Sequence, residues 1–72
     1  MYLLQALAKK LEGDIAVAKA NIRTYTERSV GIGEHPELVQ SIETEVAKAA
    51  EAQDRLNMVN NILAGDSKFI QE

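Results

Sequence analysis

The residues best equipped for chemistry are Glu34, His35 and Glu37, which surround the only proline of the chain. A histidine beside carboxylates suggests a metal-ligand set or a general base. Metal ligands on one helical face need spacings of three or four residues, and a catalytic histidine needs a nucleophile or an orienting partner. Neither can be assembled from this segment. Pro36 fits the first turn of a helix, and the glutamates favour its positive end. We therefore interpret the segment as a helix start and expect no catalytic, metal-binding or cofactor-binding residues.

The glycines just before this segment invite a second chemical reading, a phosphate-binding loop. Such loops follow a strand and carry a longer glycine pattern or a lysine, which Gly31-Ile32-Gly33 does not. A backbone function suits them better. Gly31 fits the left-handed residue that closes a helix, and Gly33 allows the chain to reverse. Gly31, Gly33 and Pro36 are thus predicted to form the turn of an αα-hairpin.

Composition narrows the classes of protein further. The 72 residues permit one small domain, and the low aromatic content of 4% is typical of long helices. The absence of cysteine excludes disulfides and thiolate metal sites. The net charge of −3 argues against a dedicated nucleic-acid binder. No apolar run is long enough to span a membrane and the N-terminus has no basic signal region, so we expect neither a membrane span nor a signal peptide.

The apolar residues predict two helices, over about 2–29 and 36–64, joined by a turn at 30–35 within one hairpin domain, 1–65. Residues 66–72 form a polar tail that we expect to be frayed. Gly65 is expected to end the second helix, and Gly13 to lie outward on the first. The first helix carries a heptad pattern of core positions: Leu4, Ala8, Leu11, Ile15, Ala18, Ile22 and Tyr25.

In the second helix the sequence predicts core positions at Val39, Ile42, Val46, Ala49, Gln53, Leu56, Asn60 and Leu63. Folding the hairpin about Ile32 pairs residues whose numbers sum to 64, so that every a position meets a d position. Large then faces small in several layers, as in Ala18 with Val46. Gln53 and Asn60 would be buried amides that specify register, although a ligand or partner remains a possible reason for them.

The two flanks of this predicted hairpin differ. One flank carries basic and acidic residues, among them Lys9, Lys19, Arg23 and Glu43. The other carries an apolar strip, which a two-helix hairpin cannot bury against itself and which predicts a partner surface. We expect the oligomer interface to comprise Leu3, Leu7, Val17, Leu38, Ala52, Val59 and Ile62.

The segment from Tyr25 to Leu63 resembles short hairpin proteins of tailed bacteriophages, marine ones especially. The likeness rests on Val30-Gly-Ile-Gly-Glu-His-Pro-Glu followed by an acidic, alanine-rich helix. It implies a virus-encoded accessory or structural protein made in a bacterial cytoplasm, and it supplies no activity or site residues.

The sequence thus predicts an all-α, antiparallel, coiled-coil-like hairpin that dimerises into a four-helix bundle. The expected function is non-catalytic binding of protein, of a second copy at least, with an unidentified protein partner possible. The alternative is an RNA-binding bundle, since the architecture is similar to that of the plasmid-encoded repressor Rop. There, basic residues of the first helices meet paired RNA loops. In this chain Glu12, Glu43 and Asp54 dilute the positive field.

Overall fold

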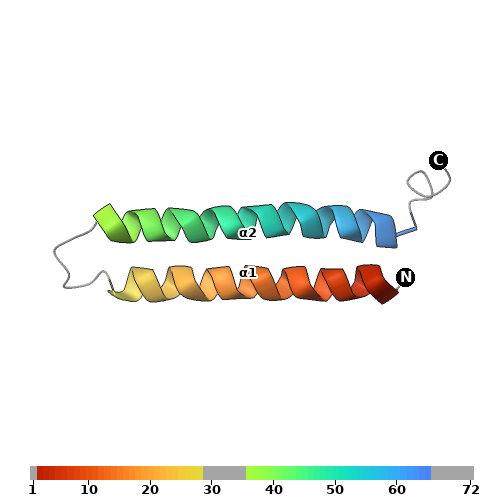
Figure 1. The fold of residues 1–72 in the computed structure, drawn as a ribbon, viewed down its shortest axis with the longest axis horizontal. Coiled ribbons are helices and arrows are strands. Elements are labelled where there is room, and N and C mark those ends of the chain that lie inside the picture. The colour runs from red at the N-terminus through yellow and green to blue at the C-terminus, as the bar shows by residue number, and fades with distance from the viewer. Residues whose placement is uncertain (1, 29–35, 66–72) are drawn as a thin grey trace.

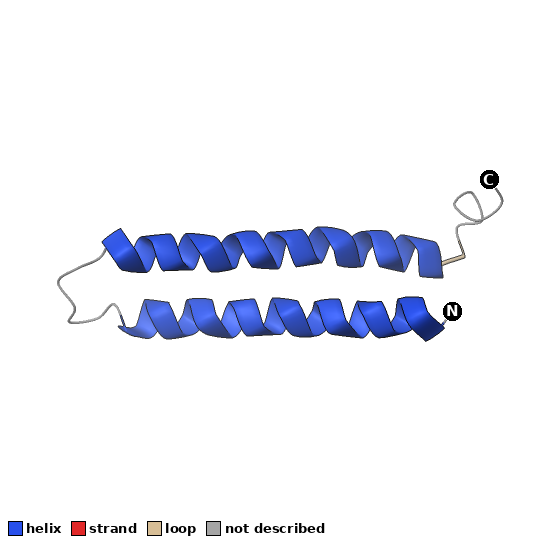
Figure 2. Cartoon of the chain, viewed as in Figure 1, coloured by secondary structure: helices blue, strands red, loops and turns tan. Residues whose placement is uncertain are grey.

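Two long helices lying side by side make up the fold. A computed structural model describes residues 2–28 and 36–65, in which α1 spans Tyr2–Arg28 and α2 spans Pro36–Leu63. The helices run in opposite directions, and α2 brings the chain back toward its N-terminus (Figure 1). Helix is the regular structure throughout the described residues, as Figure 2 shows, so the predicted all-α hairpin is confirmed.

Helix α1 packs on α2 with the face that its heptad pattern predicts. Ala8, Leu11, Ile15 and Ala18 are buried. The outer members of the same pattern, at positions 4, 22 and 25, are half-buried. Apolar residues spaced alternately by four and three keep one stripe on one side of the helix, so one stripe suffices to bind α2. Gly13 lies on the exposed side, with nothing within 4 Å of the position a Cβ would take.

Helix α2 is rotated by about 50° from the predicted orientation, half of the roughly 100° step between neighbouring residues. Four of its predicted core residues do face α1, at positions 42, 49, 56 and 63. The prediction is wrong for the other four, at positions 39, 46, 53 and 60. Gln53 and Asn60 are exposed, and Val39 and Val46 are 61% and 50% exposed. The residues one position earlier face α1 instead. The observed inner stripe of α2 consists of Leu38, Ile42, Glu45, Ala49, Ala52, Leu56, Val59 and Leu63.

The main core lies toward the open end of the hairpin. It joins Ala8, Leu11 and Ile15 of α1 to Ala52, Leu56 and Val59 of α2, with Leu4 and Leu63 packed against it. Many of the buried side chains are alanines, and no large side chain is completely buried among the described residues. The helices therefore pack through a narrow apolar seam.

The ends of α2 match their expected chemistry where they are described. Pro36 is its first residue. At the other end Gly65 has a positive φ of 82°, and its amide donates to the Ile62 carbonyl at 3.2 Å. This is the left-handed residue that a helix C-terminus favours, and it confirms the expected stop. Gly31, Gly33, Glu34, His35 and the tail 66–72 lie outside the described residues.

Candidate interaction surface

The predicted apolar flank is present, with a different membership. Leu3, Leu7 and Val17 of α1 are 70%, 40% and 61% exposed. On α2, Leu38 belongs to the inner stripe and Ile62 is half-buried. The remaining two predicted members, Ala52 and Val59, are buried in the hairpin core at 6% exposure each. Their placement on the flank was wrong, because the rotation of α2 turns them inward. Most of the exposed apolar surface of this flank therefore belongs to α1.

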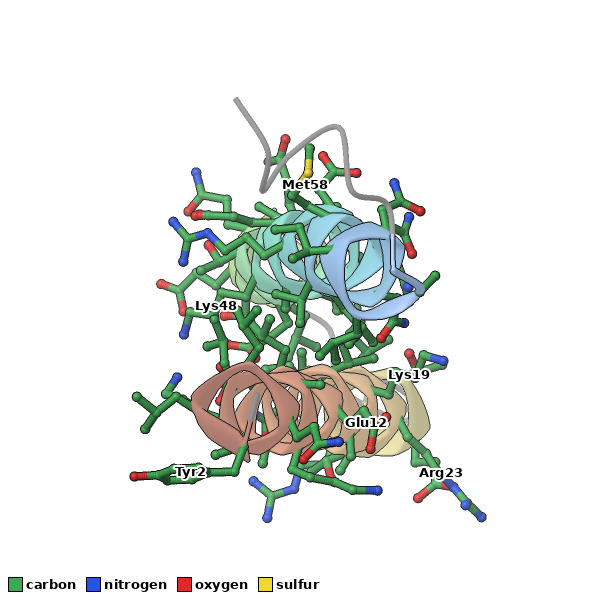
Figure 3. The ribbon with its side chains drawn as sticks, turned by 90° about the vertical axis from the view of Figure 1, so that its right-hand side faces the viewer. Tyr2, Glu12, Lys19, Arg23, Lys48 and Met58 are labelled. Carbon is green, nitrogen blue, oxygen red and sulfur yellow. The ribbon has the colours of Figure 1, made fainter. Side chains whose placement is uncertain are left out.

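The opposite flank carries charges of both signs, as the groove side does. Figure 3, viewed along the helices, places Lys48 on one side of the hairpin and Lys19 on the other. Lys9 pairs with Glu12 at 3.6 Å and Arg23 with Glu27 at 3.0 Å, so acids one turn away neutralise these bases. Val39 and Val46 add two exposed apolar side chains on α2. They provide a matched comparison for the apolar flank.

An open groove of about 340 Å³ runs between the helices on the apolar flank. Its floor is made of Leu11 and the small side chains of Ala18 and Ala52. The groove exists because the side chains at its floor are short, whereas longer side chains form its walls. Those walls are Asp14, Val17 and Asn21 from α1 and Glu45, Lys48, Glu51 and Arg55 from α2.

Among the described residues, Glu45 is the charged residue that is buried, with 7% of its surface exposed. Its Oε1 accepts a hydrogen bond from Asn21 Nδ2 of the facing helix at 3.0 Å. Its Oε2 accepts one from Lys48 Nζ at 3.2 Å. Buried carboxylates persist only when their oxygens are satisfied in this way. The hydrogen bond from Asn21, and then that from Lys48, hold the pKa of Glu45 below its ordinary value of 4.5.

The other charges of the groove are also paired. Asp14 Oδ2 lies 2.8 Å from Lys10 Nζ, and Glu51 Oε1 lies 3.3 Å from Arg55 Nη2. The groove thus presents alternating signs with little net charge. The lining holds three acids, Asp14, Glu45 and Glu51, and two bases, Lys48 and Arg55.

Sequence reasoning missed the Asn21–Glu45 contact, although a signal for it existed. The observed inner stripe of α2 has one polar residue in eight, Glu45, whereas the predicted stripe has two, Gln53 and Asn60. Counting polar residues would have favoured the observed stripe. A carboxylate at a core position argued against it, because its hydrogen-bond partner lies on the other helix.

Within residues 2–28 and 36–65, no cluster of histidine and acidic side chains is arranged to hold a metal ion. Over the same residues, neither helix has a stretch apolar and long enough to cross a membrane. Comparisons of the chain with protein-family models, with curated proteins and with solved structures give no match. The function must therefore be argued from the surface itself.

Proposed function

We propose that this hairpin is a non-catalytic interaction module that binds a second copy of itself through the apolar flank, forming a four-helix bundle. The observation that carries the proposal is the row of Leu3, Leu7 and Val17, exposed on one side of α1. Large apolar side chains gathered on one flank mark a contact surface, whereas scattered ones do not.

Sedimentation equilibrium, together with circular dichroism, tests the proposal. We expect a helical dimer at tens of micromolar. Leu7→Glu with Val17→Glu should give a monomer, because each change places a charge in the contact without a partner. Val39→Glu with Val46→Glu makes the same change on the opposite flank and should leave the dimer intact. A fully helical wild-type monomer at these concentrations would refute self-association.

RNA binding of the Rop kind remains the second candidate by architecture, and no contact in the described residues favours it. The basic residues Lys9, Lys10 and Arg23 are each within 4 Å of a carboxylate on their own helix. A gel-shift series with structured RNA decides the matter, since phosphate contacts would give affinity that falls steeply with salt.

A further inference from the structure

Helix α1 carries a second heptad stripe beside the one that binds α2. It consists of Leu3, Leu7, Lys10, Asp14, Val17 and Asn21, spaced alternately by four and three. Each member directly precedes a member of the core stripe, so the second stripe is rotated by about 100° around the helix. A helix with two such stripes has the geometry of a corner in a four-helix bundle, where each helix contacts two neighbours at about a right angle.

We propose that this second stripe binds the same stripe of a second copy, with the two α1 helices antiparallel about a two-fold axis. The inference rests on the proposed self-association and specifies its arrangement. Residues that face each other across the axis have numbers that sum to 24. The layers are Leu3 with Asn21, Leu7 with Val17 and Lys10 with Asp14, each occurring twice because the interface is isologous.

Charge complementarity selects this register. In it Lys10 of each copy meets Asp14 of the other, which adds an intermolecular partner to the pair already 2.8 Å apart within α1. Sliding the contact by one heptad, to sums of 17 or 31, places Leu7 against Lys10 or Val17 against Asp14. Those layers would set a charge against an apolar side chain, which is costly. Of these registers only the sum of 24 pairs Leu7 with Val17 and Lys10 with Asp14; its outer layer sets Leu3 against the uncharged amide of Asn21, which already donates to Glu45.

The same test excludes the other face-to-face arrangement, in which the hairpins are parallel and α1 lies over α2 of the second copy. The Asn21–Glu45 hydrogen bond fixes the level of α1 against α2, at numbers that sum to about 66. Lys10 would then face Arg55, and Asp14 would face Glu51, the nearest residues on the groove side of α2. Like charges would meet in both layers, and such contacts disfavour a wrong pairing strongly.

Crosslinking of single-cysteine chains tests the arrangement, since the natural chain has no cysteine. Leu7→Cys and Val17→Cys chains are made separately, mixed in urea, refolded together and treated with a short bismaleimide. Residues 7 and 17 of different copies should lie in one layer, whereas two residues 7 should be about 15 Å apart along the helix. We expect the mixed crosslink to exceed a statistical yield clearly, and each chain alone to crosslink little. A mixture of Val39→Cys and Val46→Cys chains is the control and should show no such preference.

A charge exchange gives a second readout. Lys10→Glu and Asp14→Lys should each weaken self-association by about tenfold or more, and an equimolar mixture of the two should recover it. Lys9→Glu and Glu12→Lys, which alter an ion pair on the opposite flank, should not show this pattern. A dimer that crosslinks at 7 with 7, or without preference, refutes the antiparallel stripe while leaving self-association standing. A monomeric wild type in sedimentation refutes both.

Discussion

Replacing Val59 and Val46 separately with alanine would test the rotation of α2. The sequence places Val46 in the core and Val59 on the surface, and the structure reverses them, at 50% and 6% exposure. Removing two buried methyl groups costs about 1.6 kcal/mol at full burial. Scaled by exposure, the loss is about 1.5 kcal/mol at Val59 and about 0.8 kcal/mol at Val46.

Helix propensity changes the comparison, because alanine is favoured over valine by up to about 0.7 kcal/mol in a helix interior. At Val46 this gain nearly cancels the lost burial, so the substitution should be close to neutral. At Val59 about 1 kcal/mol of destabilisation remains, and the cavity that is left adds to it. Urea unfolding followed by circular dichroism, at one fixed chain concentration, measures both. If Val46→Ala costs clearly more than Val59→Ala, the predicted stripe is right and the rotation of α2 is refuted.

Three further outcomes are expected. Gly13→Ala should stabilise the hairpin by about 1 kcal/mol, because the helix interior disfavours glycine and open space surrounds the site; an unchanged urea midpoint would contradict it. Gly65→Val should instead destabilise the hairpin by about 1 kcal/mol, since φ is 82° there. A melting temperature equal to that of the wild type would contradict this. Because the pKa of Glu45 is lowered, its contribution should persist above pH 4.5 and disappear as the pH falls through its lower folded-state pKa. Melts of wild type and Glu45→Gln should converge in acid, and parallel curves at all pH values would rule this out.

The prediction from sequence succeeded for α1 because every position of its core stripe is apolar. No competing stripe offered a better face, and the structure buries or half-buries each member. The end of α2 at Gly65 was equally predictable, since a left-handed residue at that point nearly requires glycine. These features depend on local chemistry alone.

The count of polar residues along α2 favours the observed stripe, but the carboxylate in that stripe argues against it until its partner is known. One possible stripe of α2 places Val39 and Val46 against α1, and the other places Glu45 there. A carboxylate in a core is costly unless it is paired. The compensating contact comes from Asn21, on the other helix. The amides of Gln53 and Asn60 had no such partner, and in the structure Gln53 donates instead to exposed Asn57 at 3.0 Å. Tertiary pairing therefore decided between two heptad frames of nearly equal apolar content.

This rotation of α2 also changes which residues lie on the apolar flank. It takes Ala52 and Val59 into the core and turns a charged row, with Lys48, Glu51 and Arg55, toward the groove. The exposed apolar side chains of the flank are then mainly those of α1. Because the core seam is narrow and holds small side chains, much of the apolar area left to bury lies in the second stripe of that helix. If this stripe is covered by a second copy, folding and association become one linked equilibrium, and the measured stability of the hairpin should rise with its concentration.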